Sequence, residues 1–129
     1  MKVAALIVAF LALALAGLAI WVRLAPSDPS VWHVDPETVT KRGPRNSFLI
    51  APGGDGPPLD LAEPPDAVAA RLDAIALATP RTTRLAGQGD FTTYITRSAV
   101  FGFPDYTSVR IRSAATGSQV QIFARSRFG

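Results

Sequence analysis

The beginning of the chain is one long apolar run. Between Val3 and Val22 there is no charged residue, while Lys2 and Arg23 stand at the two ends of the run. With a rise of about 1.5 Å per residue, a helix of this length crosses a hydrocarbon core of about 30 Å. Trp21 stands where an interfacial aromatic side chain belongs. The pattern therefore predicts a transmembrane anchor over residues 1–25, with the membrane as its partner.

A cleaved signal peptide is the alternative to a retained anchor. Ala14 and Ala16 form a small-residue pattern that resembles a cleavage site. The apolar run continues past them and exceeds the core of about 7–15 residues that is usual for a signal peptide. Cleavage after Ala25 would place Pro26 next to the scissile bond. We therefore expect a single-pass anchor in a bacterial inner membrane, with a short tail inside and the C-terminal domain in the periplasm.

Residues 26–63 are rich in proline and glycine. Nine of the eleven prolines lie between Pro26 and Pro65. Because proline fixes φ and lacks a backbone donor, neither a long helix nor a central strand is expected there. We predict an extended spacer with one short strand at 47–51. Trp32, within this spacer, is expected to pack on the domain or at the membrane interface.

Residues 64–129 change from a helical to a strand period. A helix is predicted from the prolines at positions 64 and 65 to about Ala78, ahead of Pro80. The apolar stripe of this helix consists of Val68, Leu72 and Ile75. From Thr82 onward the apolar period becomes two, which predicts strands at 82–86, 91–98, 106–113 and 118–127.

The last two strands indicate their own pairing register. With Ser113 opposite Ser118, the aliphatic residues of both strands share one face, and a slip by one residue would mix the faces. The other face then receives the pairs Arg112–Gln119, Arg110–Gln121 and Tyr106–Arg125. We therefore predict an α+β domain: a small antiparallel sheet with one helix over its aliphatic face and an arginine-rich outer face. A cation–π contact between Tyr106 and Arg125 is expected there.

Most of the excess positive charge falls on this part of the chain. The formal net charge is +3, and residues 91–129 hold five arginines against one acid. Such an excess favours an anionic lipid or an acidic envelope protein as a partner, whereas a solvated sheet face is the simpler interpretation. Nucleic acid is not expected, because no binding motif is present and the predicted topology keeps the domain away from it. The candidate ligand-binding residues are Tyr106, Arg110, Arg112, Arg125, Arg127 and Asp105.

The side chains that carry chemistry are few. The chain has no cysteine, so it has no disulfide and no cysteine nucleophile. His33 is the only histidine, and a Ser–His–Asp arrangement would require the spacer to fold back over the sheet. One histidine and two isolated glutamates are too few good ligands for a transition metal. Asp105 is best interpreted as a turn residue or as an ion-pair partner of Arg97 or Arg127. No catalytic residue, metal site or cofactor is therefore assigned.

Segments near the C-terminus resemble a known family. Residues 101–109 and 124–129 are similar to the domain of unknown function 1499 (DUF1499) family, whose members are bacterial and often membrane-anchored. Residues 32–36, 71–73 and 94–98 resemble its alphaproteobacterial branch. The resemblance implies a small α+β domain with no established activity. Family members continue past the segment around Arg127 into an Asp-x-Gly-x-Asn-x-x-Arg motif and a final helix, so the resemblance also implies a chain that is truncated at its C-terminus.

Three functional interpretations follow. The first is a non-catalytic, membrane-anchored binding or accessory domain of the bacterial envelope, with the arginine-rich face as its contact surface. The second is an envelope hydrolase or transferase whose site comprises Asp105, Arg127 and the segment missing from this chain; it requires a concave pocket that joins the two residues. The third is a fragment that has no function in this short form.

Overall fold

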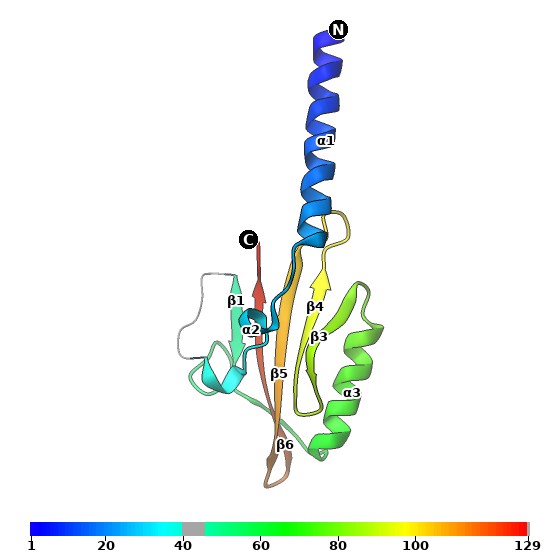
Figure 1. Cartoon of the computed structure of the whole chain (residues 1–129). Helices are drawn as coiled ribbons and strands as arrows, with labels where there is room; N and C mark the ends of the chain where they lie inside the picture. Colours follow the sequence, from blue (N-terminus) through cyan, green and yellow to red (C-terminus); the bar gives the residue numbers. More distant parts are fainter. Residues whose placement is uncertain (40–45, 129) are drawn as a thin grey trace.

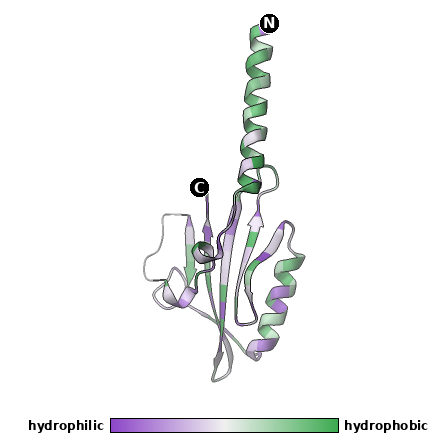
Figure 2. Cartoon of the chain, viewed as in Figure 1, coloured by the Kyte–Doolittle hydropathy of each residue, from purple (hydrophilic) through white to green (hydrophobic). Residues whose placement is uncertain are grey.

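The computed structural model describes residues 1–39 and 46–128, and a long helix stands on one end of its β-sheet (Figure 1). This helix, α1 (Lys2–Leu24), is apolar along its length, with a mean hydropathy of 2.9 in its most apolar stretch (Figure 2). None of that stretch is covered by the rest of the chain. An uncovered helix that is apolar on all sides is typical of a membrane anchor or of a signal sequence.

The sheet contains six described strands, and every pairing between them is antiparallel. The order is β1-β6-β5-β4-β3, and β2 also pairs with β6. The α+β prediction is confirmed. The strands are β1 (Ser47–Ile50), β2 (Leu59–Leu61), β3 (Thr82–Gln88), β4 (Phe91–Arg97), β5 (Pro104–Ala114) and β6 (Gly117–Ser126).

The stretch predicted to be a spacer contributes two strands to this sheet. β1 pairs with the segment of β6 from Ile122 to Arg125, and β2 pairs with the segment from Ser118 to Val120. The two short strands therefore lie one after the other along the same edge of β6. Proline is tolerated here because these are edge strands and Pro52, Pro57 and Pro58 stand in the connection between them. Residues 40–45 of the predicted spacer, and the chain end at 129, lie outside the described residues.

The register predicted for the long hairpin is confirmed. Ser113 is opposite Ser118, Ile111 opposite Val120, and Tyr106 opposite Arg125. The two strands turn through Ala115 and Thr116, which are the only residues between the last paired positions. Side chains alternate along each strand, so the aliphatic and arginine-bearing sets point to opposite sides of the sheet.

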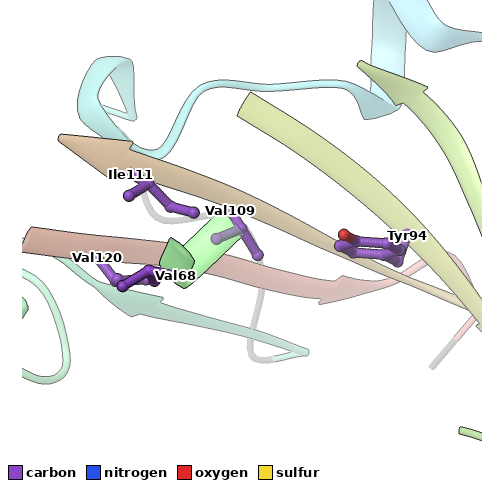
Figure 3. Close-up of a cluster of buried hydrophobic side chains, with 5 residues drawn as sticks. All are labelled: Val68, Tyr94, Val109, Ile111 and Val120. Carbon is purple, nitrogen blue, oxygen red and sulfur yellow. The ribbon is translucent and has the colours of Figure 1, made fainter. Parts of the chain in front are cut away.

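The aliphatic side of the sheet packs against α3 (Pro65–Ala78), whose bounds agree with the predicted helix. Figure 3 shows Val68 of α3 among Val109, Ile111 and Val120, with Tyr94 farther along the sheet. Leu72 and Ala76 extend the contact. Ile75, predicted to belong to the buried stripe, is instead 59% exposed. It borders a cavity of about 200 Å³ between α3 and the sheet, which Leu72, Tyr94 and Val109 also line.

The arginines lie on the opposite side of the sheet, as predicted, but the prediction that this side is an outer face is wrong. Residues 26–39, here called the strap, lie across it and include α2 (Pro29–Trp32) and the 3-10 turn η1 (Pro36–Thr38). Val34 and Val39 of the strap pack with Leu49, Ala51 and Phe123 in a second apolar cluster. The sheet is thus covered on both sides, because apolar and charged strap residues both find partners on it. We call this side of the sheet the arginine face.

Candidate functional site

Two arginines of the arginine face are paired with carboxylates of the strap. Arg110 donates from Nε to Asp35 Oδ2 at 3.0 Å and forms an ion pair with the same carboxylate through Nη2. Arg112 donates from Nε and Nη2 to the two oxygens of Glu37, at 2.8 and 2.9 Å. Asp90 lies 3.5 Å from Arg110 Nη1. The fold therefore neutralises both arginines with acids from distant parts of the chain.

These contacts also change the acidity of the two strap carboxyls. Burial alone would raise the pKa of Asp35, but the hydrogen bonds from Arg110 and from the Glu37 backbone N–H outweigh it and lower the pKa. The hydrogen bonds from Arg112 lower the pKa of Glu37. Both carboxylates are therefore charged near neutral pH, as an ion pair requires.

Closer to α1, the strap places Trp32 on the side chain of Tyr106. The two rings stack with their centroids 4.1 Å apart and an interplanar angle of 12°, and Tyr106 is only 1% exposed. The Arg125 guanidinium carbon lies 4.5 Å from the centroid of the Trp32 ring, and Arg125 Nη2 donates to the Val31 carbonyl at 2.5 Å. The prediction that Trp32 packs on the domain is confirmed. The cation–π partners of Arg125 are Trp32 and Phe123 rather than Tyr106, because the strap brings the indole to this position.

His33 belongs to a chain of hydrogen bonds beneath the strap. His33 Nδ1 is 2.7 Å from Thr93 Oγ1, which is 2.7 Å from Ser108 Oγ. The His33 ring stacks on Phe91 at 3.9 Å. Burial, followed by the nearby Arg110 charge, lowers the pKa of His33.

This arrangement fulfils one condition of a Ser–His–Asp site, since the strap folds back over the sheet. It does not expose a nucleophile: Thr93 is fully buried and Ser108 nearly so. Ser108 also contacts Thr93 rather than the imidazole. The group therefore holds the strap in place. Sequence reasoning missed it, because serine and threonine within strands carry no distinguishing local signal.

Asp105 and Arg127 lie on different sides of the sheet. Asp105 accepts a hydrogen bond from Ser126 Oγ and borders an open cavity of about 390 Å³ together with Phe48 and Thr107. Arg127 instead donates to the Pro26 carbonyl at 2.8 Å and lies near the Trp32 ring on the strap side. Arg127 is not among the described residues that line the cavity beside Asp105.

A second group of arginines lies at the end of the sheet that carries α1. In the described residues, their hydrogen-bond acceptors are main-chain carbonyls, which do not offset a positive charge. The donor–acceptor pairs are Arg23 to Val100 and Phe101, Arg81 to Arg97, Arg97 to Gly102, Arg125 to Val31, and Arg127 to Pro26. Arg125 and Arg127 thus differ from Arg110 and Arg112, although all four were predicted as one binding face.

The last turn of α1 is built into this end of the domain. Val22 is 1% exposed, and Arg23 donates to the Val100 carbonyl at 2.6 Å. Gly102 has φ of +73°, and a Cβ there would come within 2.8 Å of the Arg23 side chain, so glycine is required at this position. The Trp21 ring meets the Phe128 ring edge-on at 5.8 Å. The helix therefore continues into the domain through specific contacts.

Comparison with known proteins supports the family resemblance. The family model described as "Protein of unknown function (DUF1499)" matches residues 26–129. The chain therefore belongs to this family. No match was found among the curated proteins or among the solved structures.

Proposed function

We propose that this DUF1499 protein is a membrane-tethered domain of the bacterial envelope with a non-catalytic binding or accessory role. Helix α1 spans the inner membrane, its short N-terminal tail is cytoplasmic, and the sheet lies in the periplasm. The observation that carries the proposal is the joint at Val22 and Arg23, where an uncovered apolar helix enters the domain. Signal-peptide cleavage after Ala25 would remove both residues from the domain, so the joint favours a retained helix over cleavage there. Cleavage after Ala16 would leave both residues in place but would cut the apolar run short of a membrane span.

A binding role is favoured over a hydrolase or transferase for reasons of geometry. The enzymatic alternative needs Asp105 and Arg127 in one pocket, and these residues lie on different sides of the sheet. The hydroxyls in contact with His33 are shielded from solvent.

The contact surface is narrower than the sequence predicted. Arg110 and Arg112 are neutralised by the strap, so we assign the contact to Arg125 and Arg127, which keep their charge. Tyr106 supports this surface from below by stacking on Trp32. The partner class is anionic, either a lipid headgroup or an acidic envelope protein.

A pair of reporter fusions tests the topology. Alkaline phosphatase fused after the C-terminal residue should be active, and a fluorescent protein that matures only in the cytoplasm should stay dark at the same position. The chain should fractionate with the membrane, and its intact mass should include Met1. A processed chain, a soluble chain or a fluorescent C-terminal fusion would each overturn the proposal.

A further inference from the structure

We infer that the end of the sheet beside α1 is itself a membrane-contacting surface, in which the loop between β4 and β5 enters the headgroup region of a leaflet with anionic phospholipids. This inference rests on the proposed function, because it requires α1 to span the membrane. The surface consists of residues 98–103 of the loop, the rings of Trp21 and Phe128, and the group of carbonyl-bonded arginines described above.

The contacts with α1 determine how close the loop lies to the membrane. Trp21 and Arg23 are separated by about 3 Å along the helix axis, at the point where a span of this length leaves the hydrocarbon. Arg23 bonds the carbonyls of Val100 and Phe101 at 2.6 and 3.1 Å. Because the loop touches the last turn of the span, it lies at the depth of the lipid headgroups.

The side chains of this surface suit that depth. Val100 is 75% exposed and Trp21 is 57% exposed, so both present apolar surface where a membrane would cover it. The rings of Phe101, Phe103 and Phe128 form a continuous row, with centroids 5.5 and 5.9 Å apart. Tryptophan is enriched at the membrane–water interface, because one part of its side chain prefers lipid and another tolerates water, and the wholly apolar phenylalanine rings prefer the lipid side.

The charges at this end specify the kind of lipid. Among the residues that the structure describes, five arginines at this end bond only main-chain carbonyls, and the acids there, Asp28 and Asp105, accept hydrogen bonds from Ser30 and Ser126. This end therefore carries an excess of positive charge and attracts phosphatidylglycerol or another anionic headgroup. At the opposite end of the sheet, Arg110 and Arg112 are paired with carboxylates. An acidic protein would meet the same charge, but the loop's contact with the span favours lipid.

A single introduced cysteine tests the depth of the loop. The chain has no cysteine, so Val100→Cys carries one environment-sensitive dye, and Thr116→Cys places the same dye at the far hairpin turn. Ala99→Cys, also on the exposed loop, is a second loop position in case Val100 tolerates substitution poorly. The full chain is reconstituted in vesicles with and without phosphatidylglycerol, and each vesicle also contains a lipid-bound quencher at the headgroup level.

We expect dye at either loop position to shift its emission to the blue and to be quenched, more strongly with phosphatidylglycerol, whereas dye at Thr116 should show neither effect. Arg81→Gln should reduce the gain from phosphatidylglycerol, and Arg71→Gln, an exposed arginine on α3 paired with Glu63, should not. Loop dyes that behave like the Thr116 dye in chains that float with the vesicles would overturn this inference alone. Failure of the chain to float would overturn the proposed function, and the inference with it.

Discussion

Removing the Trp32 side chain should release the strap from the sheet. Trp32→Ala removes the ring stacked on Tyr106 and the ring beneath the Arg125 guanidinium. The stack is worth about 1 kcal/mol beyond burial and the cation–π contact about 0.5 kcal/mol. Trp32 is half-buried, so the lost burial adds roughly 1.5 kcal/mol. The free energy of unfolding should therefore fall by about 3 kcal/mol, a change of more than a hundredfold in the unfolding equilibrium.

The assay is urea unfolding of the full chain in nanodiscs, followed by the circular dichroism of the sheet. With an m-value of about 2 kcal/mol per molar urea, the midpoint should fall by about 1.5 M. Trp32→Phe keeps an aromatic ring and should lose clearly less. Val31→Ala changes an exposed neighbour in the same turn and should cost less than about 0.5 kcal/mol. If Trp32→Ala and Val31→Ala gave the same midpoint, the strap would not be held by this stack.

Three further predictions concern the strap and the joint with α1. Arg110→Met leaves the half-buried Asp35 carboxylate without its cation and should lower the free energy of unfolding by about 2 kcal/mol, somewhat less than for a fully buried pair. In a double-mutant cycle measured by urea unfolding, adding Asp35→Asn should recover part of this loss. The pKa of His33 in the folded chain lies below its ordinary value of 6.5, so the free energy of unfolding should be highest above that pH and should fall as the pH drops below it. Between urea midpoints measured above and below this pH, His33→Phe should show a smaller fall than the unchanged chain. Gly102→Ala should loosen the joint and speed proteolysis just after α1, whereas Gly89→Ala, which has a similar φ but open space around it, should strain its turn without this effect.

The hairpin of β5 and β6 was predictable because its information is local. In both strands apolar residues alternate with polar ones, and a short turn joins the strands. A slip by one residue from the observed register would no longer place the aliphatic side chains of both strands on the same side, namely Val109, Ile111, Val120 and Ile122. The bounds of α3 were predictable for a similar reason, since proline residues mark both its start and the residue that stops it. The exposure of Ile75 was not predictable, because it depends on where α3 separates from the sheet.

The position of the strap was missed because its contacts are distant in the sequence. Proline and glycine indicate what a segment cannot form, but they do not indicate what it packs against. One signal was nevertheless present: Asp35 and Glu37 are two residues apart, and so are Arg110 and Arg112. Side chains two apart on a strand share a face, so Arg110 and Arg112 of β5 point the same way, whereas Asp35 and Glu37 reach them from the 3-10 turn η1 and its N-cap. The pairing of these charges across 75 residues therefore depends on how the strap folds back over the sheet, which the equal spacing alone does not determine.

The fold divides the basic region of the sequence, residues 91–129, between two surfaces. Counting charge over residues 91–129 treats all its arginines alike, whereas the fold supplies acids to some of them and only carbonyls to the others. The acids of the strap meet Arg110 and Arg112, the arginines of the predicted face that lie farther from α1. The positive charge that remains is concentrated at the end that α1 joins, beside the exposed side chains of Trp21 and Val100. Neutralisation far from α1 and retained charge close to it are the distribution that the proposed contact with an anionic membrane requires.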